Sequence, residues 1–236
     1  AITVIITETG GNKMTYIMGR GDEAKKALEN SNNSGGNKNP LVDDDNLFVR
    51  LKADESIRVR LISSQDYVTY ASHGHYTKGI NTQPGRKAGG ERCLLCEVAN
   101  YDGEGVGTVL NTVTKMNGDT ASEWYTLYGK KRTLFVFADL DTKTLRIFDA
   151  TKNQASALIQ TIDEYKDDLD EVGFTLKRAG NKSDTTYTLN PITAKKFAEV
   201  EEAFKGFDEV TVEDEVFANA LQARTTDEQA TELRIA

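Results

Sequence analysis

All the histidine and cysteine of this 236-residue chain lies between His73 and Cys96. His73 and His75 stand two positions apart, and Cys93 and Cys96 form a Cys-x-x-Cys pair. Such a pair lets two thiolates face one ion, and a β-strand places residues i and i+2 on the same side. We therefore predict a metal site made of His73, His75, Cys93 and Cys96, which would hold together a small lobe at about residues 70–100. Zinc with a structural role is the expected occupant, because it accepts imidazole and thiolate together and needs no redox partner.

Other interpretations of these residues stay open. Two cysteines three apart can be buried small hydrophobic residues, or they can be a redox pair. A redox Cys-x-x-Cys is expected near a βαβ pattern, and none surrounds Cys93. One of the two histidines can also be a bystander, with water or another side chain completing the metal shell.

Short stretches of alternating or β-branched residues dominate the middle of the chain and predict a mainly β (α+β) fold. Helical spacing of apolar residues marks 154–169 and 194–207, and a further helix that then frays is expected after residue 210. Many short strands with few interposed helices favour a small β-barrel followed by C-terminal helices. The expected strands are residues 47–51, 57–62, 67–73, 106–116, 123–128, 133–139, 145–149, 173–177 and 185–189.

Composition divides the chain into three parts. Residues 1–44 are predicted to be a flexible N-terminal arm and linker, with a short β segment at 1–13, a brief helix at 20–29 and an Asn-, Ser- and Gly-rich run at 30–40. Residues 45–192 form the predicted barrel-like core with its metal lobe. Residues 193–236 form an acidic helical segment.

Charge is distributed unevenly along the chain. The net formal charge of −8 argues against a nucleic-acid partner, yet residues 50–148 carry 14 basic and 11 acidic side chains, whereas residues 149–236 carry 10 basic and 19 acidic ones. This asymmetry predicts a basic binding core and an acidic segment that faces a protein partner or masks the core. A solvated acidic helix is the simpler alternative. No apolar run approaches the length of a membrane span, so no membrane partner is expected.

Basic and aromatic side chains recur on the same predicted strand faces. Arg58 and Arg60 alternate with apolar neighbours, and three consecutive cations follow at residues 130–132. Single-stranded nucleic acid needs this combination, since cations contact phosphates and flat rings stack on unpaired bases. Individual rings such as Phe137 and Phe148 can equally be core residues. The predicted nucleic-acid contacts are Arg58, Arg60, Tyr70, Tyr76, Lys78, Lys130, Lys131, Arg132, Phe137, Arg146, Phe148, Lys177, Arg178 and Tyr187.

No enzymatic motif accompanies these features. The sequence lacks a GxxxxGK[ST] phosphate loop, a GxSxG elbow and an HExxH pair, and the Gly-rich run at 103–107 is predicted to be a hairpin connection. Both histidines belong to the predicted metal site, which leaves no imidazole for general-base catalysis. A site that uses every histidine and cysteine is expected to be closed and structural, so the chain is predicted not to be an enzyme.

The order of motifs along the chain is itself informative. In sequence, the motifs are a strand at 58–62, His73-Gly74, a basic loop at 86–92, the Cys-x-x-Cys at 93–96, and a later strand at 174–177 with the turn Gly180-Asn181. This order resembles the zinc-containing single-stranded DNA-binding proteins of tailed phages, a family typified by the T-even helix-destabilising protein. The resemblance covers roughly residues 45–190, and the metal segment is its specific part.

The chain departs from that family at one position of the metal segment. The family has a third cysteine between the histidine and the Cys-x-x-Cys, where this chain has Gln83-Pro84-Gly85-Arg86. His73 matches the histidine ligand of the family. His75 has no counterpart there and would have to substitute for the missing cysteine.

The resemblance implies an OB-fold-like barrel with a small zinc-binding subdomain, in a protein that coats single-stranded DNA during phage replication or recombination without sequence preference. It further implies self-association on DNA through basic residues of the N-terminal arm, and recruitment of replication or recombination proteins by acidic residues at 199–215. The arm residues in question are Arg20, Lys25 and Lys26. The expected location is the cytoplasm of an infected bacterial host, in keeping with two cysteines too close to close a useful disulfide loop.

Two further functions stay open on the residues alone. A zinc-stapled interaction protein or transcription-associated adaptor would use the acidic segment to recruit protein and would not bind oligo-dT. A zinc hydrolase acting on nucleic acid would need an open position on the metal.

Overall fold

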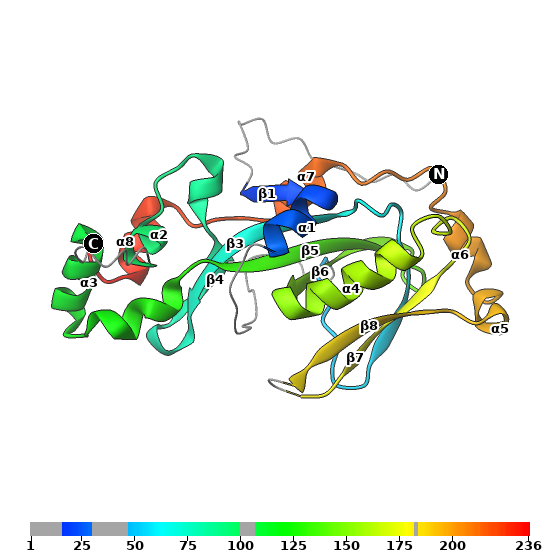
Figure 1. The fold of residues 1–236 in the computed structure, drawn as a ribbon, viewed down its shortest axis with the longest axis horizontal. Helices are drawn as coiled ribbons and strands as arrows, with labels where there is room; N and C mark the ends of the chain where they lie inside the picture. Colours follow the sequence, from blue (N-terminus) through cyan, green and yellow to red (C-terminus); the bar gives the residue numbers. More distant parts are fainter. Residues whose placement is uncertain (1–15, 30–46, 100–106, 182–183) are drawn as a thin grey trace.

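A computed structural model of the chain describes residues 16–29, 47–99, 107–181 and 184–236. These residues form one antiparallel sheet with helices against both faces and a helical lobe at one end (Figure 1).

Eight antiparallel strands of the described residues form the sheet. They are β1 (Ile17–Arg20), β2 (Ser56–Arg60), β3 (Tyr67–His75), β4 (Ile80–Pro84), β5 (Lys130–Asp139), β6 (Thr144–Thr151), β7 (Phe174–Ala179) and β8 (Thr186–Pro191). The order across the sheet is β1-β3-β5-β2-β7-β8, with β4 paired to β3 and β6 paired to β5. β5 is the central strand, because β3 and β2 share one of its edges and β6 follows the other.

The sheet does not close into a barrel, so that part of the sequence-based prediction is wrong. Closure would need hydrogen bonds between β6 and β8, but residues 47–49 occupy the outer edge of β6 through backbone hydrogen bonds with Ile147. Side chains span the remaining gap instead, and the ring centroids of Phe148 on β6 and Tyr187 on β8 lie 4.5 Å apart. The broader prediction of a mainly antiparallel α+β fold is confirmed.

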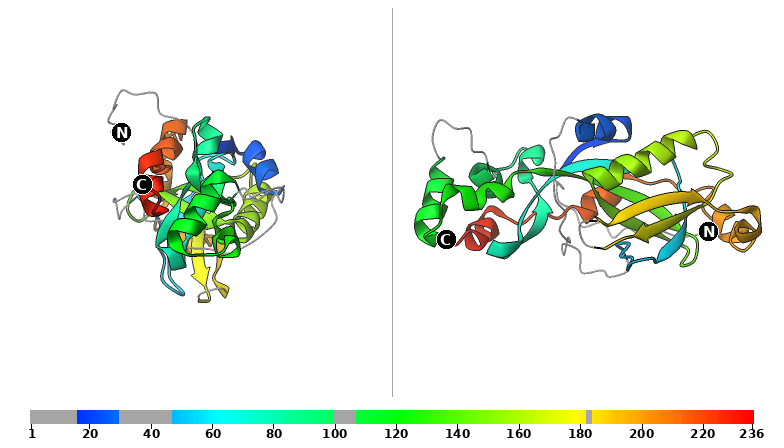
Figure 2. Two further views of the ribbon diagram at one scale, coloured as in Figure 1. Left: turned by 90° about the vertical axis from the view of Figure 1, so that its left-hand side faces the viewer. Right: turned by 60° about the horizontal axis from the view of Figure 1, so that its bottom comes forward.

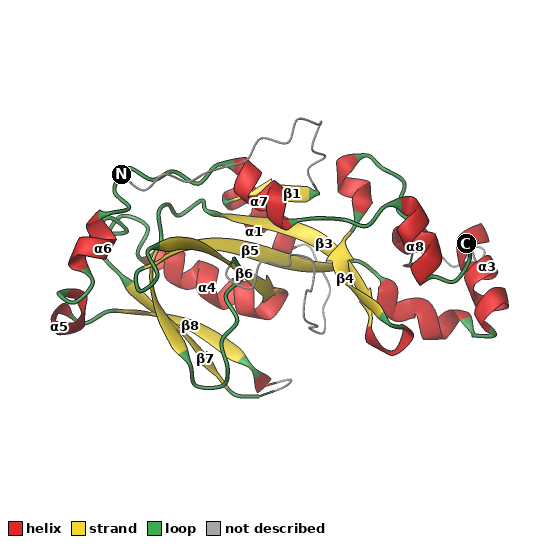
Figure 3. Ribbon diagram, turned by 180° about the vertical axis from the view of Figure 1, so that it is seen from behind, coloured by secondary structure: helices red, strands yellow, loops and turns green. Residues whose placement is uncertain are grey.

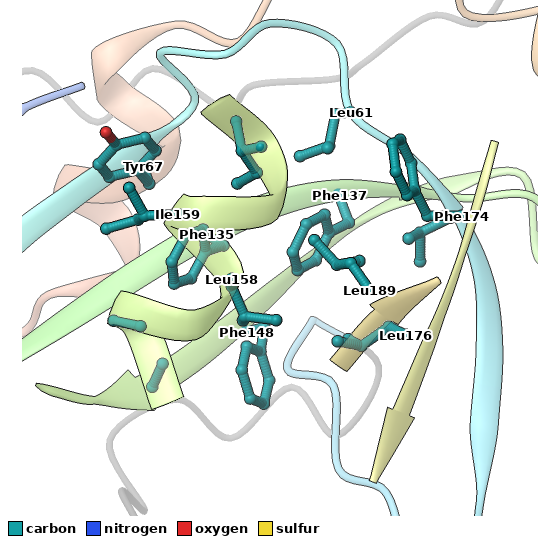
Figure 4. Packing of buried hydrophobic residues seen from close by; sticks show 14 of the residues in the cluster. Leu61, Tyr67, Phe135, Phe137, Phe148, Leu158, Ile159, Phe174, Leu176 and Leu189 are labelled. Atoms are coloured by element: carbon teal, nitrogen blue, oxygen red, sulfur yellow. The ribbon is translucent and has the colours of Figure 1, made fainter. Parts of the chain in front are cut away.

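The main core lies between the sheet and two helices, α1 (Asp22–Glu29) and α4 (Lys152–Glu164). Figure 4 shows the part of this core in which Leu158 and Ile159 of α4 lie against Phe135 and Phe137 of β5. Side chains alternate along a strand, so Phe135 and Phe137 of β5 enter this core together. Their rings stack with centroids 5.9 Å apart. α4 begins at a capping box formed by Thr151 and Gln154, which satisfies backbone N–H groups that a helix start leaves unpaired.

The opposite face of the sheet is covered by the C-terminal segment. Leu134 and Val136 of β5 point to this face and pack with Phe217 from helix α7 (Asp214–Ala220). The helix expected at 194–207 is instead two short helices, α5 (Ala194–Phe197) and α6 (Glu201–Lys205). They lie at the far end of the sheet, and from there the chain returns along the molecule to the lobe (Figures 2 and 3).

The lobe is built mainly from helices rather than strands. It contains α2 (Leu94–Ala99), α3 (Thr108–Asn117), the 3-10 helix η3 (Ala121–Leu127) and the last helix, α8 (Thr226–Glu232). The strands expected at 106–116 and 123–128 are therefore wrong. In α3 the β-branched residues are outweighed by helical spacing, which places Leu110 and Val113 on one buried face of the lobe.

The two ends of the chain differ from expectation. The brief helix predicted at 20–29 is confirmed as α1, but residues 17–29 are not part of a flexible arm, because β1 and α1 belong to the sheet and the main core. The expected fraying after residue 210 is not observed, since α8 is capped and Leu233 after it is fully buried. The β segment predicted at 1–13, the linker at 30–40 and nearly all of the loop at 103–107 lie outside the described residues. In the part of the chain that is described, no helix combines the length and apolar character that crossing a membrane requires.

Candidate metal centre

Three of the four predicted metal ligands come together in the lobe. His73, Cys93 and Cys96 each offer one ligand atom, and these atoms all lie within 4.8 Å of one another. The Nε2 atom of His73 is 3.0 Å from the sulfur of Cys96. His73 and Cys93 are buried, whereas Cys96 is partly exposed. This group could hold a metal ion.

Local structure brings the two sulfurs to one side. Cys93 precedes α2 and Cys96 lies in its first turn, where the backbone N–H of Cys96 points to the Cys93 sulfur at 3.4 Å. His73 comes from β3, which extends past the main core into the lobe and pairs there with β4. A helix start and a strand thus face each other across the site.

The ring of His73 is held in one tautomer. Its Nδ1 atom lies 2.5 Å from the carbonyl oxygen of Leu127, which can only accept a hydrogen bond. Nδ1 therefore carries a hydrogen, which leaves Nε2 as the ring nitrogen that can bind a metal. Histidines that bind metals usually donate their other N–H in this way, which fixes the ring orientation and raises the basicity of the ligand atom.

The two sulfurs have opposite protonation tendencies. The pKa of Cys93 is lowered to about 3 by a hydrogen bond from Cys96 and then by His73 and the backbone amide of Arg86, against the opposing effect of burial. The pKa of Cys96 is raised because its proton is held by the Cys93 sulfur and because the group is buried. The metal-free pair thus shares one proton. Binding of a divalent ion by both sulfurs would release that proton.

A second residue supports the site from the end of the chain. Gln229 on α8 is fully buried, and its Oε1 atom accepts a hydrogen bond from the backbone N–H of Leu94 at 2.9 Å. Its Nε2 atom donates to the Cys93 sulfur at 3.8 Å. Sequence reasoning missed Gln229, although the Thr225–Glu228 capping box that starts its helix can be recognised from residue spacing.

His75 lies outside the group of three. Its Nε2 atom faces the carbonyl oxygen of Glu123, and its Nδ1 atom lies 3.2 Å from the hydroxyl of Thr77, so both ring nitrogens have partners. Its ring makes an edge contact with Trp124. The two rings bind different carbonyl oxygens along η3, that of Leu127 for His73 and that of Glu123 for His75, and only the His73 ring reaches the sulfurs.

Several predicted nucleic-acid contacts lie in the interior. Phe137 and Phe148 belong to the main core, and Tyr70 is fully buried on the opposite face of the sheet. Arg132 is also buried and forms an ion pair with Asp149 at 2.9 Å. The Tyr70 hydroxyl donates to the same carboxylate.

Arg58 and Arg60 of β2 bind three acidic residues, two of them from the C-terminal segment. Arg58 forms ion pairs with Asp141 and with Glu199, the latter at 2.8 Å. The Arg60 guanidinium forms an ion pair with Asp208 at 2.6 Å and is buried. The cationic character expected of this strand is therefore largely neutralised within the molecule.

Other predicted contacts have structural partners as well. Arg146 binds Asp139 at 3.4 Å, and Arg178 donates to the carbonyl oxygen of Leu51 at 2.6 Å. Tyr187 is half-buried against the main core.

The remaining predicted contacts are nearer the surface. Tyr76 has 82% of its surface exposed. Lys78 forms an ion pair with Asp119 at 2.7 Å, and Lys131 donates to the carbonyl oxygen of Ala27. Lys177 is exposed on β7.

One surface feature was not predicted. Tyr125 has 63% of its surface exposed, and its ring centroid lies 5.5 Å from that of Tyr128. The ammonium group of Lys130 lies 5.6 Å from the Tyr128 ring centroid. We call Tyr125, Tyr128 and Lys130 the aromatic–lysine strip. The available signal was a pair of tyrosines three residues apart just before a run of cations, but the stretch was expected to be a strand, which would separate the rings.

Comparison with protein-family models, with curated proteins and with solved structures gives no match to this chain.

Proposed function

We propose that this protein binds single-stranded DNA through the aromatic–lysine strip, beside a structural zinc centre. The observation that carries the proposal is the exposed ring of Tyr125 in contact with Tyr128, with the ammonium of Lys130 over the second ring. Exposed rings can stack on bases that have no paired partner, and a neighbouring cation can contact the phosphates. Double-stranded DNA keeps its bases stacked inside and offers no such surface.

The metal centre supports the strip through the backbone. Leu127 lies between Tyr125 and Tyr128 in the chain, and its carbonyl oxygen accepts the hydrogen bond from Nδ1 of His73. Zinc bound at Nε2 and at the two sulfurs would hold the His73 ring still, and with it the end of η3 that carries the tyrosines. The donor set of one imidazole and two thiolates suits zinc.

The distribution of ion pairs limits where phosphates can bind. Arg58, Arg60 and Arg132 already hold carboxylates within the molecule. Phosphate contacts are therefore expected from lysines, first Lys130 and then Lys177. A protein of this kind would coat single strands without sequence preference during replication or recombination, and the acidic C-terminal segment is its proposed contact with other replication proteins.

The direct test is a titration of fluorescently labelled oligo-dT, followed by anisotropy at low and physiological salt. Tyr125→Ala is expected to weaken binding by about 1–3 kcal/mol, roughly five- to 150-fold, since one stacking platform is lost. Tyr125→Phe keeps the ring and is expected to bind like the wild type. Lys130→Ala is expected to weaken binding and to reduce its salt dependence.

A matched control and two alternative outcomes complete this test. Lys166→Ala removes one exposed positive charge beyond the end of α4, away from the strip, and is expected to change oligo-dT affinity little. Absence of oligo-dT binding at low salt would contradict the proposal and favour the adaptor function. Cleavage of the oligonucleotide in a metal-dependent manner would favour the hydrolase.

A further inference from the structure

The last helix of the chain reaches the proposed metal centre through one buried side chain. Gln229 on α8 is fully buried and contacts Cys93, which lies 136 positions earlier in the sequence. Its Nε2 atom donates to the Cys93 sulfur at 3.8 Å, and its Oε1 atom accepts from the backbone N–H of Leu94 at 2.9 Å. A buried amide whose oxygen and nitrogen both have partners is held in one orientation.

The orientation of this amide follows from its two partners. A backbone N–H can only donate, so the atom that faces Leu94 is the oxygen, and the NH₂ group faces the sulfur. An N–H group directed at a thiolate stabilises its charge and fixes the direction of the sulfur. Gln229 therefore supports Cys93 as the Leu127 carbonyl supports His73, because each holds one proposed ligand through a hydrogen bond.

Other contacts dock α8 on the rest of the lobe. Gln83 of β4 is fully buried and donates from Nε2 to the Glu232 carboxylate at 2.7 Å. Asn117 at the end of α3 donates to the carbonyl oxygen of Leu233 at 3.0 Å, and the Leu233 side chain is fully buried. Helix α8 thus contacts β4, α3 and the start of α2 together, and the contact from Gln229 is the one that reaches a proposed metal ligand.

We infer that Gln229 is a positioning residue of the metal centre and that it couples metal binding to the docking of α8 on the lobe. This inference rests on the metal binding proposed above. A metal bound to Cys93 keeps the sulfur ionised and in place as the partner of the Gln229 amide, and a docked α8 holds the sulfur in the direction that the metal needs. The coupling is reciprocal, so the factor by which metal favours docking equals the factor by which docking raises metal affinity.

The coupling connects the metal to the end of the acidic C-terminal segment. Leu233 belongs to the core of the lobe, whereas Phe217 on α7 belongs to the separate core on the sheet. Loss of metal is therefore expected to loosen α8 while α7 stays packed on the sheet. The metal then regulates the exposure of the last helix in the segment that is the proposed contact with other replication proteins.

Hydrogen exchange followed by mass spectrometry tests the coupling on the full chain, with and without Zn²⁺. The backbone N–H of Gln229 donates to Thr225 and that of Leu233 donates to Gln229, so both amides report on α8. In the wild type, Zn²⁺ is expected to slow exchange in α8 at least fivefold. Equal exchange of α8 in the two states, with Zn²⁺ binding verified, would overturn the coupling.

A variant at residue 229 tests the role of the amide. Gln229→Met removes both hydrogen bonds and keeps a long side chain in the buried position. It is expected to weaken Zn²⁺ binding by about tenfold to a hundredfold, and Zn²⁺ is expected to slow exchange in α2 but no longer in α8. Gln222→Met, at an exposed position between α7 and α8, is the matched control and is expected to behave like the wild type. Protection of α8 by Zn²⁺ that persists in Gln229→Met would overturn the role of Gln229.

The Co²⁺-loaded chain separates positioning from a purely structural role. Its near-ultraviolet bands report charge transfer from sulfur to metal, and an N–H donated to the sulfur stabilises the electrons that are transferred. Gln229→Met is therefore expected to shift these bands to longer wavelength. Glu232→Ala loosens the other end of α8 by removing the acceptor of Gln83, and is expected to leave the band position unchanged. No shift in Gln229→Met, or the same shift in both variants, would show that the amide does not position the sulfur.

The remaining outcomes distinguish this inference from the proposed function. The wild-type exchange measurement decides the coupling even where circular dichroism shows that a variant does not fold. Failure of the wild type to bind Zn²⁺ or Co²⁺ would overturn the zinc centre and the inference together. Normal binding of Zn²⁺ and of oligo-dT, with no response of α8 to the metal, would overturn the inference alone.

Discussion

At the scale of single residues, the hydrogen-bond partners and neighbours of a side chain decide whether it can bind a metal or a ligand. His73 and His75 lie in the same strand, yet only His73 directs a ring nitrogen at the cysteines, and Leu127 binds its other nitrogen. His75 donates to Glu123 and contacts Trp124. The same contrast separates the exposed ring of Tyr125 from rings that fill the core.

The difference between the two histidines leads to a prediction on zinc affinity. His73→Ala removes one of three donors and is expected to weaken Zn²⁺ binding by about tenfold to a hundredfold or more. His75→Gln is expected to change it little, because a glutamine amide can also donate to the Glu123 carbonyl. Competition with a chromophoric chelator measures both affinities. Similar losses in the two variants would argue that both histidines bind the metal.

Helix α8 illustrates how one element serves the site at the scale of secondary structure. Its first turn is closed by a capping box in which the Thr225 hydroxyl accepts from the backbone N–H of Glu228 and the Glu228 carboxylate accepts from that of Thr225. The cap positions Gln229, which contacts the Cys93 sulfur and the start of α2. A short helix of this kind depends on its cap and on packing rather than on its own propensity.

Loss of this cap has a defined expected cost. Thr225→Ala is expected to lower the free energy of unfolding by about 1 kcal/mol, in the range 0.5–2 kcal/mol, because the N–H of Glu228 loses its acceptor. Thr231→Ala on the same helix is the matched control, since its hydroxyl bonds only to the carbonyl of Asp227 on the exposed side. Urea unfolding followed by circular dichroism compares the two. A larger effect of Thr231→Ala would contradict this role of the cap.

The C-terminal segment connects the parts of the whole molecule. It places Glu199 and Asp208 on the arginines of β2, covers the sheet with Phe217, and ends in the lobe with Leu233. Glu199 and Asp208, two of the acidic residues that sequence alone assigned to a partner-facing segment, thus bind within the chain. The lobe and the sheet are also joined by the extended strands β3 and β5 (Figure 1).

The hydrogen bond between His73 and the Leu127 carbonyl links the metal centre to the aromatic–lysine strip, so removal of the metal is expected to affect DNA binding. Chelation of zinc is expected to weaken oligo-dT binding several-fold, because His73 and the Leu127 carbonyl it holds are released, while the sheet persists on its separate core. Anisotropy measures affinity, and far-UV circular dichroism checks that the strands remain. The His73→Ala variant, already depleted of metal, should not respond to chelator. Unchanged wild-type affinity after verified metal loss would refute the coupling.

The sequence by itself determined those features that depend on residues close together along the chain. The Cys-x-x-Cys spacing and a nearby histidine correctly grouped His73, Cys93 and Cys96, and alternation correctly put Phe135 and Phe137 on one face. These relations follow from the fixed geometry of a turn or a strand over a few residues.

Tertiary structure alone decided the contacts between distant segments. The ion pair between Arg58 and Glu199 joins residues 141 positions apart, and nothing in the local pattern of either residue specifies it. Three other features also join distant segments. They are the irregular register between β3 and β4 beside His75, the pairing of residues 47–49 with the outer edge of β6, and the contact of Gln229 with Cys93. Each depends on which surfaces pack together in the folded chain. A buried polar group needs a hydrogen-bond partner and a buried apolar group needs packing neighbours, and segments distant in sequence can supply either.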